Sequence, residues 1–355
     1  MVTPPAETLK PAWPEAELES CPTCPICGSR QRTRMHGNLN DPLFGAPGRW
    51  ILWQCHACGA GWLDPRPDPA SIPRAYSSYL THSVSEAAIR LARPGILQGI
   101  KLQATHAILN HELGYRLNPA LPLPVARRIL TRKRQRQILN RVRHLPAPGN
   151  PTAQVLDVGS GNGAFLVMAK NLGYEATGLE PDPQATALAR AHGCRVHTGS
   201  LPHPALPHEH YDQLTLAHVI EHLHDPLALL RECLALLRPG GRLWIQTPNL
   251  KGAGHAYWGG DWRGLEPPRH LVLFTPESLK QLLHEAGFQG IRLLPSPLEA
   301  REMFRHSLAI RLGIDLRENR KPHLDRAAQK AARLADAAAF GDPEVAEAIT
   351  AVAWK

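Results

Sequence analysis

The stretch Q-V-L-D-V-G-S-G-N-G-A-F-L, residues 154–166, decides the fold of this chain, and G-L-E-P-D follows at residues 178–182. The largely apolar run 155–158 predicts a short buried strand, and the glycines directly after it predict a loop into a helix over 164–172. Such a loop lets a ligand lie against the backbone, because no Cβ obstructs the approach. The pattern therefore predicts half of a nucleotide-binding βαβ unit.

Two carboxylates indicate which ligand the loop binds. Glu180 ends the next predicted strand, where such folds place the acid that accepts hydrogen bonds from ribose hydroxyls. Asp157 lies two residues before the first glycine, where it would repel a pyrophosphate but can pair with the ammonium of an amino acid. The sequence therefore favours S-adenosylmethionine over NAD, although the glycine spacing also fits the looser motif of nicotinamide enzymes.

With these residues, the chain resembles the class I S-adenosylmethionine-dependent methyltransferases over roughly residues 154–294. Two more segments carry the resemblance in the expected order, A-H-V-I-E-H-L-H-D-P at 217–226 and L-R-P-G-G-R-L-W-I-Q-T-P-N at 237–249. The resemblance implies an α/β fold, a Rossmann-like seven-stranded sheet with helices on both faces. It also implies a set of cofactor-binding residues: Asp157, Gly159, Ser160, Gly161, Gly163, Glu180, Pro181, Ala217 and His218. For Gly163, close packing of helix on strand is an equal alternative to ligand contact.

Cysteine spacing gives a second signal. Cys24-x-x-Cys27 and Cys55-x-x-Cys58 are each followed by glycine, the arrangement of two knuckles that hold one tetrahedral zinc ion. Cys21-x-x-Cys24 has the same spacing, and we favour Cys24 and Cys27 because of their glycine. Four thiolates leave no open coordination position, so this zinc is expected to be structural. The region resembles the zinc-ribbon-like segment of some bacterial sugar and envelope-polysaccharide methyltransferases.

Charge and composition bear on location and partners. No apolar signal peptide or membrane-spanning run stands out, so a cytoplasmic protein is expected. Residues 81–150 hold twelve Lys and Arg against two Glu, a local charge of +10 where the whole chain carries +9. This basic segment suits an anionic substrate such as a nucleotide sugar, a peripheral membrane surface or nucleic acid, and a solvated helix face is the plain alternative. Nucleic acid ranks last, because no aromatic residue interleaves with the charges over 127–143.

Five parts are expected along the chain. They are a disordered lead over 1–20, a zinc-ribbon-like domain over 21–64, a linker and basic helical segment over 65–150, a methyltransferase domain over 151–295 and a helical tail over 296–355.

The acceptor side is predicted to lie in residues 254–279, a segment rich in aromatic, histidine and charged residues that resembles the acceptor loop of the same methyltransferases. A hydroxyl or carbon acceptor must lose a proton, and histidine is the natural base near neutral pH. His270 is the first candidate and His222 the second, while a structural His270 that bonds a backbone carbonyl is an equal alternative. His218 and His222 also fit the H-x-x-E-H motif of zinc proteases, but the strand-like residues before them argue against the helix that such a site needs.

The expected function is methyl transfer from S-adenosylmethionine to a small-molecule, sugar or glycan acceptor. Nucleic-acid methylation is less favoured, because residues 217–222 lack the D/N-P-P-Y/F signature of amino-methylating DNA enzymes and the Pro-Cys of cytosine-carbon enzymes. The alternatives are an NAD-dependent oxidoreductase and a zinc-ribbon binding module with a non-catalytic methyltransferase domain. The intact Asp157, glycines and Glu180 argue against the binding module.

Overall fold

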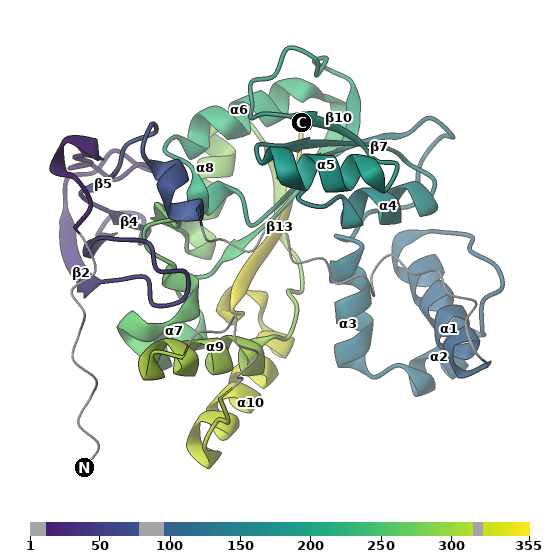
Figure 1. The fold of residues 1–355 in the computed structure, drawn as a ribbon. Coiled ribbons are helices and arrows are strands. Elements are labelled where there is room, and N and C mark those ends of the chain that lie inside the picture. The colour runs from purple at the N-terminus through teal and green to yellow at the C-terminus, as the bar shows by residue number, and fades with distance from the viewer. Residues whose placement is uncertain (1–11, 78–95, 315–321) are drawn as a thin grey trace.

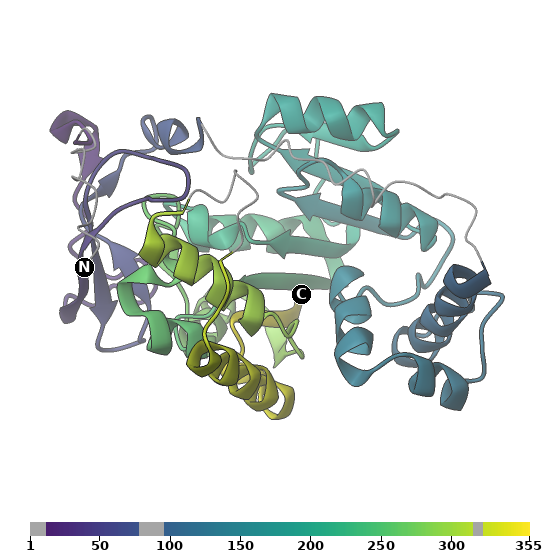
Figure 2. The same cartoon turned by 60° about the horizontal axis from the view of Figure 1, so that its bottom comes forward.

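A computed structural model describes residues 12–77, 96–314 and 322–355 of the 355-residue chain. A central sheet separates two smaller parts (Figures 1 and 2). The N-terminal strands lie beyond one end of the sheet, and helices α1 (Ile96–Leu113), α2 (Leu123–Ile129) and α3 (Arg132–Arg141) lie beyond the other.

Within the described residues, the central sheet has seven strands in the order β12-β13-β10-β9-β6-β7-β8. Their bounds are β6 (Gln154–Val158), β7 (Glu175–Glu180), β8 (Arg195–Thr198), β9 (Tyr211–Ala217), β10 (Leu237–Pro248), β12 (Gln289–Leu293) and β13 (Ala348–Trp354). Strands β6 to β10 run parallel, and β13 runs antiparallel to both of its neighbours. The order reverses between β6 and β9, and the carboxyl ends of strands at such a switch point form the usual ligand crevice of an open α/β sheet. The predicted seven-stranded α/β fold is confirmed.

Helices cover both faces of this sheet. Leu156 and Val158 of β6 share a buried cluster with leucines of α6 (Pro226–Leu236) and α8 (Pro276–Glu285). Val155 packs instead with Phe165 of α4 (Ala164–Asn171), and α5 (Pro183–Ala191) lies beside β7 and β8. Because successive side chains of a strand point to opposite faces, α4 lies on the face opposite α6 and α8.

The C-terminal part differs from the prediction. Helices α9 (Ala300–Leu312) and α10 (Arg326–Gly341) agree with a helical tail, but β13 follows them and enters the sheet between β10 and β12. The prediction of a wholly helical tail, and of a methyltransferase domain that ends at residue 295, is therefore wrong. The signal was the apolar run I-T-A-V-A-W at 349–354, which begins eight residues after the alanine-rich helix ends and pairs with strands distant in sequence.

The zinc-ribbon-like region is a small antiparallel sheet of β2 (Arg32–Leu39), β3 (Trp50–Cys55) and β4 (Gly61–Leu63), to which β11 (Val272–Leu273) adds an edge. Beside it, β1 (Leu18–Glu19) pairs with β5 (Arg66–Pro67). The remaining elements are α7 (Ala253–Trp258) and the short 3₁₀ helices η1 (Glu15–Glu17), η2 (Ile72–Tyr76), η4 (Ile220–His222), η5 (Gly259–Asp261), η6 (Arg263–Leu265) and η8 (Pro343–Val345).

The predicted disordered lead is ordered in its second half. Trp13 is only 4% exposed, its ring lies 5.5 Å from that of Trp50, and β1 lies within the same stretch. Prolines and acids pointed to disorder, but a buried tryptophan anchors this strand to the ribbon. The prediction is wrong for residues 12–20, and residues 1–11 lie outside the described residues.

The basic segment is helical where it is described, and α3 contacts α10. Lys133 Nζ lies 2.8 Å from Asp336 Oδ2, and Arg136 donates to the carbonyl groups of Ala339 and Phe340 at the end of α10. Cations stabilise a helix at its carboxyl end, where the last carbonyls lack partners. Two cations of the segment therefore have a structural role, while residues 81–95 lie outside the described residues. No helix among the described residues is long and apolar enough to cross a membrane.

Candidate functional site

The glycine loop lies at the carboxyl end of β6 and leads directly into α4. Gly159, Gly161 and Gly163 have φ values of 73°, 53° and 80°, a left-handed region that strongly favours glycine. A Cβ built on Gly161 has no heavy atom within 4 Å among the described residues. Gly161 therefore borders open space, as a residue that a ligand approaches should.

The other two glycines are required by packing. A Cβ on Gly159 would lie 2.5 Å from the side chain of Val219, and one on Gly163 would lie 2.9 Å from both Ala189 and Cys194. Close packing, the alternative to ligand contact, is therefore sufficient to explain why residue 163 is a glycine. Gly159 fixes the distance between the loop and the residues that follow β9.

Glu180 ends β7 beside the same loop. Its Oε2 accepts from the Gly161 amide at 2.7 Å and its Oε1 from the Asp182 amide at 2.9 Å. Burial raises the pKa of this carboxyl. Pro181 follows, and Asp182 caps α5. The Ser160 hydroxyl is buried and has no hydrogen-bond partner among the described residues. The loop thus places a carboxylate beside the open face of Gly161, which fits the hydroxyls of a nucleoside, while this Ser160 hydroxyl is buried against Gly178.

Asp157 is fully buried and already has a cation beside it. Its Oδ1 accepts from Arg143 Nη1 and, at 2.9 Å, from the Thr215 hydroxyl, while Oδ2 is buried with no partner among the described residues. The Arg143 guanidinium stacks 3.9 Å from the centre of the Phe165 ring. The pairing of Asp157 with a ligand ammonium stays a prediction. Arg143 is a cation of the basic segment whose contact with this acid the sequence reasoning missed.

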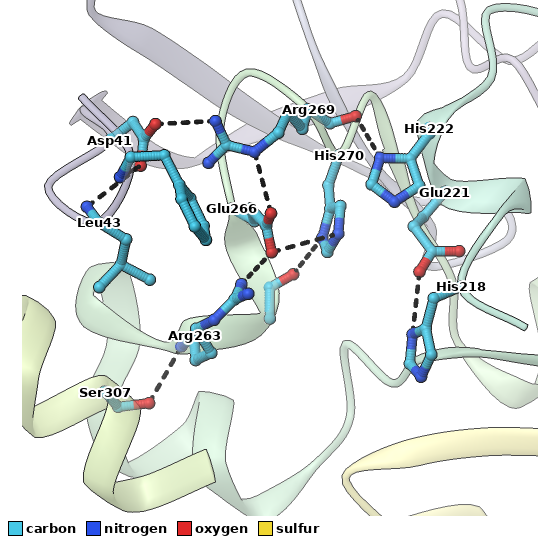
Figure 3. Close-up of polar contacts among 12 residues, drawn as sticks. Asp41, Leu43, His218, Glu221, His222, Arg263, Glu266, Arg269, His270 and Ser307 are labelled. Carbon is cyan, nitrogen blue, oxygen red and sulfur yellow. Dashed lines mark hydrogen bonds and ion pairs between the residues drawn. The ribbon is translucent and has the colours of Figure 1, made fainter. Parts of the chain in front are cut away.

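The residues after β9 form a second polar group, in which the side chains of His218 and Glu221 point toward one another (Figure 3). This group lies next to the loop, because Val219 packs against Gly159. Ala217 is half-buried at the end of β9, and His218 has a φ of 54°, which is uncommon outside glycine. His218 Nδ1 lies 3.2 Å from Glu221 Oε1, and the Thr247 hydroxyl donates to Glu221 Oε2 at 2.9 Å. The 3₁₀ helix η4 covers only Ile220–His222, so His218 and His222 do not share an α-helix and the protease motif does not apply. Sequence reasoning assigned no role to Glu221.

His222 and His270 lie together, with ring centres 4.7 Å apart. His270 Nδ1 donates to the Gly264 carbonyl at 2.8 Å, and burial lowers the pKa of His270 to about 4. His222 Nδ1 donates to the Arg269 carbonyl at 3.1 Å and lies 2.9 Å from the Tyr76 hydroxyl. The geometry of His270 agrees with the structural alternative, and a catalytic role of either residue stays a prediction.

The acceptor-side segment joins the ribbon to the central sheet. Strand β11 pairs with β4, and the Leu63 amide donates to the Leu271 carbonyl at 3.1 Å. The Leu271 amide in turn donates to the Glu221 carbonyl at 2.8 Å. One short stretch of backbone therefore holds the ribbon, His270 and Glu221 in fixed positions relative to one another.

A buried charge network fixes the same segment (Figure 3). Arg269 is fully buried and pairs with Glu266 Oε1 at 2.9 Å and Asp41 Oδ2 at 2.8 Å, and Arg263 pairs with the other oxygen of Glu266. Burial raises the pKa of Glu266, but the charges of Arg263, His270 and Arg269 outweigh it and hold that pKa well below its usual range. Asp41 belongs to the ribbon region, so the network ties the two parts by charge.

Replacing Arg269 should be strongly destabilising. We expect Arg269→Met to lower the free energy of unfolding by about 3–5 kcal/mol, because Glu266 and Asp41 would be left as buried charges without this partner. Urea unfolding measures the change. Lys251→Met is the matched control, since its pair with Glu277 is exposed on both sides and should contribute at most about 1 kcal/mol. Equal losses in the two variants would contradict the importance of the network.

The four predicted zinc ligands come together. Cys24 and Cys58 have sulfurs 3.6 Å apart, Cys27 and Cys55 have sulfurs 3.5 Å apart, and one ligand atom from each residue lies within 4.8 Å of all the others. A tetrahedral site with Zn–S bonds of about 2.3 Å places sulfurs about 3.8 Å apart, so the thiols fit zinc. Cys21 is not in this group, and its thiol donates to the Thr23 carbonyl.

The two knuckles have the same turn. The amides of Gly28 and Gly59 donate to the carbonyls of Cys24 and Cys55, at 2.9 and 3.1 Å, and both glycines have φ above 70°. This explains why a glycine follows each pair, the feature used to prefer Cys24 and Cys27 over Cys21.

The parallel sheet, the glycine loop and the acid at the end of β7 define a Rossmann-like cofactor-binding domain. Residues 130–293 match a family model described as "Methyltransferase domain". This part of the chain is a class I S-adenosylmethionine-dependent methyltransferase domain, as the resemblance implied.

Curated relatives agree with this class. The "Ubiquinone biosynthesis O-methyltransferase" of Xanthomonas campestris pv. campestris (strain B100) is 34% identical over 114 residues, which cover 30% of this chain and 47% of that protein. The protein of the same name from Xanthomonas oryzae pv. oryzae (strain PXO99A) is 33% identical over 111 residues, covering 29% and 46%. The chain thus spans about half the length of the curated relatives it matches.

Solved structures of low identity also align. A SAM-dependent methyltransferase from Archaeoglobus fulgidus is 19% identical with a TM-score of 0.42, over 63% of this chain and 95% of that one. An S-adenosylmethionine-dependent methyltransferase from Mesorhizobium loti is 17% identical with a TM-score of 0.41, over 62% and 97%.

Proposed function

We propose that this protein transfers a methyl group from S-adenosylmethionine to a hydroxyl group of a small-molecule acceptor. The observation that carries the proposal is the open face of Gly161 beside the Glu180 carboxylate, at the carboxyl ends of β6 and β7. S-adenosylmethionine supplies an electrophilic methyl group on a sulfonium. Glu180 would accept from its ribose hydroxyls, Ser160 would hydrogen-bond it from the loop, and Ala217 would border it at the end of β9.

The acceptor is proposed from the relatives and from the segment over 254–279. The relatives are named as O-methyltransferases, which favours a hydroxyl as the methylated group. A hydroxyl acceptor includes the sugar or glycan that the resemblance implied. His222 and His270 are proposed to line the acceptor side. The carboxylate of Glu266 lies beside them, 3.8 Å from His270 Nε2.

Two further parts belong to the proposal. The four thiols of the ribbon would hold a structural zinc ion, because their spacing and burial suit a closed site. Exposed cations on α2 and α3, namely Arg127, Arg128, Arg132 and Arg134, would face an anionic partner such as a charged acceptor or a lipid surface.

A labelled-methyl assay tests the proposal. The full chain is incubated with methyl-labelled S-adenosylmethionine and, in separate reactions, a catechol, a nucleotide sugar and total RNA. We expect label in a small-molecule hydroxyl product, and at least about 10-fold less label from Glu180→Ala when S-adenosylmethionine is below saturation. Asp157→Ala is a poor blank, since it would leave the partly buried Arg143 without its carboxylate partner. Label in RNA alone would overturn the acceptor class, and no label in any reaction would favour a binding module.

A further inference from the structure

We infer that His218, oriented by the buried carboxylate of Glu221, removes the proton from the acceptor hydroxyl, an assignment that rests on the proposed methyl transfer. The sequence reasoning placed His218 only among the cofactor-binding residues and named His270 and His222 as candidate bases. The three histidines differ in their hydrogen-bond partners and in their exposure, and these differences favour His218 as the base.

The position of His218 is held from both sides. Its backbone N–H donates to the Gln246 carbonyl at 2.9 Å, and the next residue, Val219, packs directly on Gly159 of the cofactor loop. His218 nevertheless has a φ of 54°, a conformation that costs energy for a residue other than glycine. Backbone conformations of this kind concentrate at functional sites, because surrounding contacts must enforce them.

The partner of His218 is a buried carboxylate that also lies near the other two histidines, since ligand atoms of Glu221, His222 and His270 lie within 4.8 Å of one another. Glu221 is fully buried, and its two oxygens are occupied by His218 Nδ1 and the Thr247 hydroxyl. The ionised carboxylate accepts, so Nδ1 carries the proton, and Nε2 keeps its lone pair. The His218 side chain is 51% exposed, and its ring lies apart from the Glu266 network (Figure 3). His218 therefore offers a basic nitrogen to an incoming acceptor.

The other two histidines have weaker arrangements for this task. His270 and His222 donate through Nδ1 to backbone carbonyls, which orient a ring but carry no charge to stabilise an imidazolium. The side chain of His270 is only 6% exposed, and its Nε2 faces Glu266 at 3.8 Å. His270 is thus enclosed, and both residues suit the wall of the acceptor side. His218 differs because its ring is exposed and its Nδ1 is hydrogen-bonded to a carboxylate.

The proposed step conserves atoms and charge. The hydroxyl proton of the acceptor passes to His218 Nε2, and an oxygen lone pair forms the new O–CH₃ bond. The electron pair of the breaking S–CH₃ bond stays on the donor sulfur, which becomes a neutral thioether. Glu221 keeps its charge and stabilises the imidazolium, which then releases its proton to water.

The pH dependence follows from the charges around His218. Desolvation by the surrounding protein lowers the pKa of this half-exposed ring, but the hydrogen bond and charge of Glu221, together with the charges of Glu299 and Glu266, outweigh it and raise the pKa above the ordinary value of 6.5. A base must be neutral, so the rate should rise with pH through that raised pKa. Removing the charge of Glu221 should move the midpoint to lower pH.

The experiment combines kinetics with a titration that needs no acceptor. Methyl transfer is measured against pH for the wild type, His218→Asn and Glu221→Gln, with whichever of catechol and a nucleotide sugar the wild type methylates. We expect His218→Asn to lower kcat by about 100-fold or more, with unchanged affinity for S-adenosylmethionine. In parallel, NMR follows the His218 imidazole in the wild type and Glu221→Gln, and its pKa should fall in the variant.

A second His–carboxylate pair supplies the control. His208 lies 3.3 Å from Glu232 on the surface, far along the chain from the loop, and His208→Asn should keep the wild-type rate and pH profile. Wild-type kinetics in His218→Asn, or an unchanged His218 titration in Glu221→Gln, would overturn the assignment. If wild-type protein transfers no methyl group, the proposed function fails, while the titration still decides the His218–Glu221 pairing.

Discussion

Replacing Gly161 by asparagine should abolish most of the binding of S-adenosylmethionine while the fold is retained. Asparagine tolerates the left-handed conformation of Gly161, and its side chain meets open space rather than protein. The side chain would occupy the space that the proposed ligand needs, so we expect the dissociation constant to rise about 100-fold, or about 3 kcal/mol. The free energy of unfolding should fall by only about 1 kcal/mol. Calorimetric titration and urea unfolding measure the two effects.

Gly163 provides the matched contrast. Gly163→Ala should lower the stability by about 2–4 kcal/mol, because its Cβ meets Ala189 and Cys194 in addition to the conformational cost. A Gly161→Asn protein that binds S-adenosylmethionine as tightly as the wild type would show that the ligand does not lie on this loop.

Loss of zinc should disable methyl transfer through the acceptor-side segment. Structural zinc contributes about 10–16 kcal/mol of binding free energy in small zinc domains, so Cys55→Ser is expected to unfold the ribbon. Strand β11 pairs with β4 and would lose that partner, which releases the backbone that carries His270 and contacts Glu221. Metal analysis and hydrogen exchange of β4 and β11 measure both consequences. S-adenosylmethionine should still bind, because the contacts of the loop are with Val219, Ala189 and Cys194.

Cys21→Ser is the control for this prediction. Its thiol lies outside the four-sulfur group, so the variant should bind one zinc ion and keep its activity. Loss of zinc from Cys21→Ser with retention in Cys24→Ser would contradict the ligand assignment. Unchanged exchange of β11 on zinc removal would contradict the coupling between ribbon and acceptor side.

The sequence predicted the parts of the site that depend on local pattern. A strand, a glycine loop and an acid at the end of the next strand are local features, and the structure brings Gly161 and Glu180 together as a hydrogen-bonded pair. The two knuckles were predicted for the same reason. Each is a local motif, in which the cysteine spacing and the glycine that follows it determine the turn at Gly28 or Gly59.

The parts that were missed depend on contacts far apart in sequence. Arg143 reads as one cation of a basic segment until the fold places it on Asp157, and β13 gains its role only by pairing with β10 and β12. Trp13 lies in a proline-rich lead, and Trp50 covers it. Glu221 was visible within H-x-x-E-H, but only the left-handed backbone at His218 turns that histidine onto the carboxylate.

The central claim is that the loop over residues 159–163 binds S-adenosylmethionine, and calorimetric titration of the zinc-loaded full chain tests it most directly. We predict that S-adenosylmethionine binds at one site, that NAD does not compete, and that Glu180→Ala weakens the binding by about 10-fold or more through loss of the ribose contact. Binding of NAD in preference to S-adenosylmethionine, or binding that is unaffected by Glu180→Ala, would contradict the account.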